Sequence, residues 1–130
     1  MTATVDIERP LEASVANTFD VIGWEIELAG ARCIMLDSII GDVMKSLPQD
    51  NRERILEGLH TVDLLSQQLT SLSAFARKMG DSAGSDVFVP VHGALREITL
   101  GALADRMQGA LGGTEQGIND REEAGDLDLF

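Results

Sequence analysis

The sequence predicts an all-α protein: a long antiparallel helical hairpin that dimerises into a four-helix bundle, with a weaker third helix and a flexible acidic C-terminal tail. Three observations predict this fold. Apolar residues recur at helical spacing through two long stretches, a proline-containing turn separates those stretches, and 44% of the 130 residues are hydrophobic, which is enough for a folded core. We therefore expect one helical domain over residues 1–111 and a tail with a terminal docking segment over residues 112–130.

The first helix is predicted from an unbroken apolar row with alternating spacings of four and three residues. Its members are Ile22, Ile26, Ala29, Cys33, Leu36, Ile40, Val43 and Leu47. This is the spacing of a seam that packs against another helix. A second row, Leu28, Met35 and Ile39, makes the apolar stripe wider than one antiparallel neighbour covers. The earliest start that the sequence allows is Pro10, and Pro48 ends the helix because the residue before a proline avoids the helical conformation.

The second helix begins at a capping-box sequence, in which Asp50 is the expected N-cap and Glu53 reaches back to it. Apolar residues then follow a heptad repeat as far as Gly80, the expected terminator. The expected a residues are Ile55, Val62, Leu69 and Ala76, and the expected d residues are Gly58, Leu65, Leu72 and Met79. Because only a few residues around Pro48 separate the two helices, they should form an antiparallel hairpin.

The rest of the chain is less regular. Residues 80–90 are expected to form a loop with a short extended piece at 87–89, and Pro90 opens a third helix to Met107 that three glycines weaken. From Gly112 onward, glycine and acidic residues dominate, which predicts a flexible tail. The tail nevertheless ends in Asp126-Leu127-Asp128-Leu129-Phe130. Because a solvated tail does not need three large apolar side chains at its tip, this ending favours a docking segment.

Two helices cannot cover both apolar rows of so long a hairpin. Each helix of about 30 residues is roughly 45 Å long, and a glycine-rich third helix covers little of that length. Homodimerisation into a four-helix bundle would bury both rows. The structural alternative is a monomeric three-helix bundle.

Composition and charge exclude several classes of function. The formal charge is −12, from 10 Lys and Arg against 22 Asp and Glu, so neither nucleic acid nor a membrane surface is an expected partner. One cysteine, Cys33, allows no internal disulfide, and no zinc-ligand cluster is present, so we expect no metal site. The N-terminus lacks the basic and apolar segments of a signal peptide, and no stretch is long enough for a membrane span. We therefore expect a cytoplasmic protein.

A carboxylate and an amide are expected one turn apart on the second helix. Asp63 at position b and Gln67 at position f point away from the a/d seam, as does His60 at f. Leu56 and Leu64 share this outward side, where a solvated helix face seldom carries leucine, so together with His60 they are the expected partner-docking residues of the helix. The plainer alternative, an ordinary solvated polar face, stays open.

The segment Val62-Asp63-Leu64-Leu65-Ser66-Gln67 resembles the Asp-x-x-x-Gln motif of the CheZ-type chemotaxis phosphatases, and the small CheT-like proteins of chemotaxis systems are a further comparison. In the CheZ-type family the motif lies on the long hairpin of a dimeric four-helix bundle. A terminal segment with Leu and Phe docks on the receiver protein CheY, and the chain end with Leu127, Leu129 and Phe130 resembles that segment. The resemblance implies hydrolysis of the phospho-aspartate on a CheY-like receiver in chemotaxis signalling.

The same resemblance implies a role for each site residue. Gln67 would enter the receiver's site and orient the attacking water, and Asp63 would pair with the receiver's active-site lysine. The receiver would supply Mg²⁺, so this chain needs no cofactor of its own. Because phosphoryl transfer passes through a loose transition state, placing the water in line is most of the catalytic task.

Two other functions remain open. A non-catalytic adaptor on the same scaffold would bind a chemotaxis signalling protein through Leu56, Leu64 or the tail, without accelerating hydrolysis. A histidine phosphotransfer domain would use His60, although the neighbouring carboxylate of Asp63 would repel an incoming phosphoryl group. Release of free phosphate separates a phosphatase from both.

Overall fold

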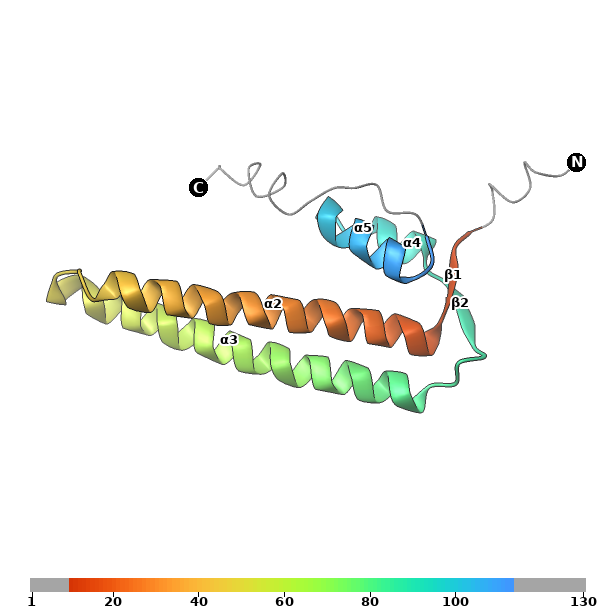
Figure 1. The fold of residues 1–130 in the computed structure, drawn as a ribbon, viewed down its shortest axis with the longest axis horizontal. Helices are drawn as coiled ribbons and strands as arrows, with labels where there is room; N and C mark the ends of the chain where they lie inside the picture. Colours follow the sequence, from red (N-terminus) through yellow and green to blue (C-terminus); the bar gives the residue numbers. More distant parts are fainter. Residues whose placement is uncertain (1–9, 114–130) are drawn as a thin grey trace, which may run out of the picture. The chain divides into compact units, whose positions relative to one another are not determined.

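The computed structural model describes residues 10–113. In chain order the elements are β1 (Glu12–Ser14), α2 (Val15–Met44), α3 (Gln49–Ser82), β2 (Phe88–Pro90), α4 (His92–Arg96) and α5 (Gly101–Ala110). The described chain is mostly helical, and α2 and α3 run side by side in opposite directions (Figure 1). The predicted helical hairpin is therefore confirmed. The expected docking segment at the C-terminus lies outside the described residues.

The chain divides into two compact units. The hairpin unit, residues 22–78, contains most of α2 and α3 and the turn between them. The sheet unit combines the described residues 10–21 and 79–113, and so contains the outer ends of both long helices, both strands and the two short helices. The candidate site lies in the hairpin unit.

Small residues line the contact between the two helices of the hairpin unit. Gly23 and Gly30 of α2 are buried, and so are Ser66 and Ser73 of α3. The Ser73 hydroxyl donates a 2.8 Å hydrogen bond to the backbone carbonyl oxygen of Gly23. A Cβ atom added to Gly23 would lie 2.9 Å from Cγ of Arg77. The helices therefore approach too closely at this point for a larger residue than glycine.

This close approach corrects the predicted seam. On α3 the e positions Ser66 and Ser73 take the buried places that the heptad pattern assigned to the d positions, and Leu65 and Leu72 remain 42% and 52% exposed. Because serine allows a closer approach than leucine, the helices turn their small residues toward each other. In the single chain, seven members of the predicted rows are exposed and are not buried between α2 and α3: Ala29, Leu36, Val43, Gly58, Leu65, Leu72 and Met79.

The start of α2 falls within the range that the sequence allows, and its end differs from the prediction. The helix begins at Val15, directly after the residues that form strand β1. It ends at Met44, ahead of Leu47. Arg52 of α3 holds the turn that follows: Nε donates to the carbonyl oxygen of Leu47 at 2.9 Å, and a terminal nitrogen donates to that of Lys45 at 3.3 Å. The turn's carbonyl groups are thereby satisfied by a side chain.

Helix α3 is longer than predicted at both ends. The helix begins at Gln49, which places Asp50 in the first turn and not at the N-cap, and it continues past Gly80 to Ser82. Gly80 is buried, and an added Cβ would lie 2.7 Å from Oδ1 of Asp20 and 3.1 Å from the carbonyl oxygen of Ala16. This glycine therefore serves close packing against α2 and does not end the helix.

The sheet unit has a small core of its own. β1 pairs antiparallel with β2, with Ala13 opposite Val89. This two-stranded sheet corrects the all-α prediction, since three-residue strands are too short to show a period in the sequence. The cluster of buried apolar residues consists of Ala13, Val21, Val91, Leu95 and Leu111.

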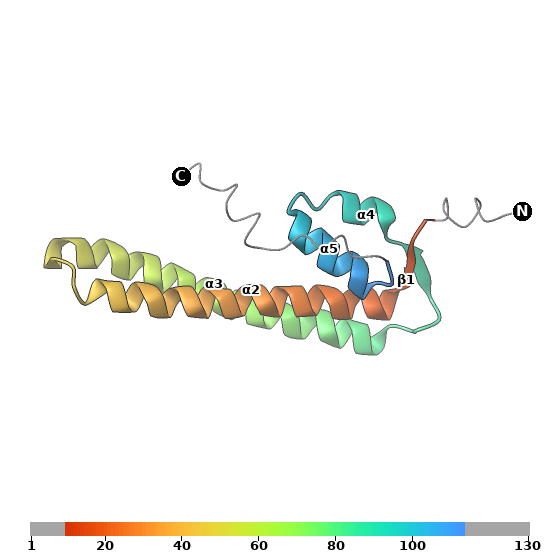
Figure 2. The same ribbon diagram turned by 45° about the horizontal axis from the view of Figure 1, so that its top comes forward.

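The predicted third helix is two helices, α4 and α5, which lie beside each other (Figure 2). The chain leaves the helical conformation between them, where Leu100 has φ −80° and ψ 104°. Ile98 and Thr99 are β-branched and favour helix weakly, and the break lets Ile98 pack against the buried cluster. Packing of this side chain therefore outweighs continuation of the helix.

Candidate functional site

Asp63 and Gln67 lie together on α3 with both side chains exposed. Nε2 of Gln67 donates a 3.0 Å hydrogen bond to Oδ2 of Asp63. The adjacency and exposure expected from the four-residue spacing are thus observed. A primary amide has two N–H donors and an acceptor oxygen, so this one bond leaves Gln67 able to donate and accept further hydrogen bonds.

The Asp63–Gln67 pair belongs to a longer stripe along one side of α3. Spacings of four and three residues join Leu56, His60, Asp63, Gln67, Thr70, Ala74 and Arg77. His60 is exposed and Leu56 is 52% exposed, so both predicted docking residues share a side with the pair. Leu64 is also exposed, about a quarter of a turn around the helix from the stripe. Leu127, Leu129 and Phe130, the other predicted docking residues, lie outside the described part of the chain.

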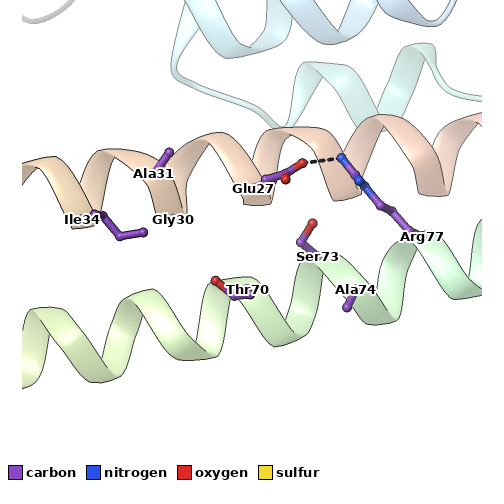
Figure 3. Close-up of a pocket in the computed structure, with 8 residues that line it drawn as sticks. All are labelled: Glu27, Gly30, Ala31, Ile34, Thr70, Ser73, Ala74 and Arg77. Carbon is purple, nitrogen blue, oxygen red and sulfur yellow. Dashed lines mark hydrogen bonds and ion pairs between the residues drawn. The ribbon is translucent and has the colours of Figure 1, made fainter.

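A hollow between α2 and α3 lies alongside this stripe. It is lined by Glu27, Gly30, Ala31, Ile34, Thr70, Ser73, Ala74 and Arg77 (Figure 3). The Thr70 hydroxyl donates to the carbonyl oxygen of Ser66 at 2.9 Å, and the Ser73 hydroxyl donates to that of Gly23. We call the side of the hairpin that carries the stripe and the hollow the polar flank.

Three side chains meet at one end of the hollow. A terminal nitrogen of Arg77 donates to a carboxylate oxygen of Glu27 (Figure 3). The same guanidinium lies over the ring of Trp24, with Cζ 4.1 Å from the ring centroid, a distance at which a cation is attracted to the ring face. Sequence reasoning missed this group, because Trp24 and Arg77 are brought together only by the register of the two helices.

The other side of the hairpin is apolar. Leu36 and Leu72 follow Ile34 and Thr70 of the hollow by two residues, which is about 200° around each helix. They therefore lie on the side away from the hollow, where their exposed fractions are 46% and 52%. We call this side the apolar flank; its members are Ala29, Leu36, Val43, Leu65 and Leu72.

A protein-family model matches residues 13–130 of the chain. The chain belongs to this family, a domain of unknown function (DUF8776). No curated protein and no solved structure matches the chain. Since the description of the DUF8776 family states no activity, function has to be argued from the site.

The DUF8776 chain has no group of three or more His, Cys, Asp or Glu side chains placed to hold a metal ion within residues 10–113. Over the same range, no helix combines the length and the apolar character that crossing a bilayer requires. The groups able to do chemistry on the polar flank are the carboxylates of Asp63 and Glu27, the amide of Gln67, the imidazole of His60, the guanidinium of Arg77 and two hydroxyl groups of the hollow.

Proposed function

We propose that this protein accelerates the dephosphorylation of the phospho-aspartate on a CheY-like receiver in chemotaxis signalling, with Gln67 orienting the attacking water. The observation that carries the proposal is the exposed, hydrogen-bonded Asp63–Gln67 pair on a long helix. Because both side chains are exposed on a helix, they can enter the active site of another protein. A pair enclosed in a pocket of this chain would instead suit a small-molecule substrate.

Gln67 suits the chemistry of this reaction. The transition state of phosphoryl transfer is loose, so the incoming group mainly has to hold a water in line with the leaving oxygen. The amide of Gln67 offers an acceptor for a water proton and a donor for an oxygen of the phosphoryl group. Its hydrogen bond to Asp63 restricts the rotamers of the long side chain, which lowers the entropy lost when the water is positioned.

Asp63 would align the two proteins. Its carboxylate accepts several hydrogen bonds at once, so it would keep Gln67 in place while pairing with the receiver's active-site lysine. That charged contact would fix the register of Gln67 over the phosphoryl group. The receiver would contribute Mg²⁺ and the phosphorylated aspartate, and this chain would contribute no cofactor.

Exposed residues around the pair would form the docking surface. Leu56 and His60 lie on the same stripe as Asp63, and Leu64 lies beside it. We extend the proposal to the terminal residues Leu127, Leu129 and Phe130, which would bind an apolar groove on the receiver. The intervening acidic and glycine-rich residues would act as a tether that raises the effective concentration of the receiver at Gln67.

We also propose that two copies associate through the apolar flank to form a four-helix bundle. Its five residues are exposed in the single chain, and an apolar patch of this kind is usual where subunits meet. The polar flank lies on the other side of each hairpin, so a dimer would present two Asp63–Gln67 pairs. A protein that serves such a receiver would work in the cytoplasm.

The test is release of inorganic phosphate from purified, radiolabelled CheY-like receivers with and without the purified protein. Faster release that depends on the protein supports a phosphatase. Acid-labile label on His60 would instead identify a phosphotransfer domain. The exposed leucines Leu56 and Leu64 favour a second candidate, an adaptor for a chemotaxis signalling protein, and binding without faster release would identify it.

A further inference from the structure

The hollow on the polar flank has no role in the proposed reaction. Half of its lining residues contribute small or apolar groups: Gly30, Ala31, Ile34 and Ala74 (Figure 3). The two hydroxyl groups of its lining, on Thr70 and Ser73, already donate to backbone carbonyl oxygens. An apolar side chain entering the hollow would therefore remove apolar surface from water without breaking a hydrogen bond.

Arg77 offers an unused donor at the end of the hollow. Its guanidinium is held by Glu27 and by the Trp24 ring. Its Nε is buried and donates to no acceptor in the part of the chain that the structure describes. The Arg77 side chain is 38% exposed. A carboxylate entering the hollow would therefore pair with the guanidinium from its solvent side and form a charge-assisted hydrogen bond.

The hollow is close enough to Gln67 to be covered by the same partner. Thr70, Ala74 and Arg77 continue the stripe of α3 that carries Asp63 and Gln67. Arg77 lies ten residues beyond Gln67, which is about 15 Å along the helix axis. A stable protein contact covers about 800 Å² on each partner, a patch roughly 30 Å across, so a receiver centred on Gln67 would reach Arg77.

We propose that the hollow is a second contact point for the receiver, which would insert an apolar side chain beside Ala74 and pair a neighbouring carboxylate with Arg77. This inference rests on the proposed function, since it names the same partner. Arginine and tryptophan are the residues most often found to dominate binding energy at protein interfaces, and here they stand together at an exposed edge. The contact would set affinity and leave the chemical step to Gln67.

Steady-state kinetics with a phosphorylated receiver test the hollow. Ala74→Phe fills it and Arg77→Gln removes its cation. The matched control is Gln49→Phe, at an exposed position of α3 that is 18 residues before Gln67 and so about 27 Å away along the helix axis, outside the patch that the receiver would cover. We expect the first two variants to raise KM about tenfold, the effect of one good interface contact, with kcat within about twofold of wild type. The control should leave both unchanged. An unchanged KM in both hollow variants would overturn the inference.

A binding measurement separates this inference from the proposed function. Trp24 is the only tryptophan, so its indole N–H gives one resonance in the isotope-labelled full chain, and it lies against Arg77. Adding the receiver activated with beryllium fluoride should shift this resonance saturably, and Ala74→Phe should abolish the shift. A shift without phosphate release would support the hollow and contradict the phosphatase. Phosphate release that needs Gln67, with the Trp24 resonance unmoved, would support the phosphatase and contradict the hollow.

Discussion

The two flanks of the hairpin are built from the same two helices and differ in chemistry. The apolar flank exposes leucine and valine and carries no charged group among its five members. The polar flank carries the Asp63–Gln67 pair, the hollow and the Glu27–Arg77 ion pair. An apolar surface gains most from permanent burial, whereas a polar one tolerates water between encounters. The comparison favours a permanent contact on one flank and a transient partner on the other.

Both flanks depend on the small residues between the helices. Because Gly23, Gly30, Ser66 and Ser73 let the helices approach closely, the larger side chains are turned outward to either side. A conventional leucine seam would have buried Leu65 and Leu72 and left one flank without its apolar surface.

The largest effect on the free energy of unfolding is expected from Gly23→Leu. An added Cβ would already lie 2.9 Å from Cγ of Arg77 and 3.3 Å from the carbonyl oxygen of Ser73, so the helices must separate. Overpacking of this kind costs about 1–3 kcal/mol and occasionally more. Urea unfolding followed by circular dichroism measures the loss. Gly41→Leu is the control, because no atom lies within 4 Å of a Cβ there; equal losses in both variants would contradict the close contact at Gly23.

The next prediction concerns association of two copies through the apolar flank. Replacing Leu65 and Leu72 together by lysine places two charges on the proposed contact between copies, and like charges facing each other oppose association. Sedimentation equilibrium should show wild type as a dimer and the double variant as a monomer with unchanged helix content. Ser71→Lys, on the exposed outer side of α3, should stay dimeric. A monomeric wild type would contradict the proposed bundle.

The smallest effect is expected from the chain end. Removing residues 126–130 should raise the Kd for the receiver about tenfold, because a tethered second contact acts through effective concentration. Calorimetric titration measures the change, and replacing only Asp126 and Asp128 by asparagine separates charge from the apolar side chains of Leu127, Leu129 and Phe130. Unchanged affinity after truncation would remove the docking segment from the account.

The sequence predicted what lies within one helix better than what lies between helices. The exposed Asp63–Gln67 pair follows from a spacing of four residues, which every helix converts into adjacency. The a positions, such as Val62 and Leu69, are half-buried as expected. The exposure of Leu65 and Leu72 in the single chain was not predicted. An apolar row in the sequence does not indicate whether the same chain or a second copy covers it.

Two further features could not be read from the sequence for a physical reason. The ion pair of Glu27 with Arg77 joins residues 50 positions apart, so it depends on the register of α2 against α3. The pairing of β1 with β2 is set by the packing of Ala13 and Val91 in a shared cluster, and three-residue strands carry too few side chains to show it.

The central claim is that Gln67 positions the water that attacks the receiver's phospho-aspartate. The most direct measurement is phosphate release from one phosphorylated receiver at saturating protein, comparing wild type, Gln67→Ala and the neighbouring exposed Gln68→Ala. Removing one positioning contact costs about 2.7–4 kcal/mol, so Gln67→Ala should lose about 100-fold or more of the acceleration while Kd stays within about twofold, and Gln68→Ala should match wild type. Equal rates for wild type and Gln67→Ala would contradict the account.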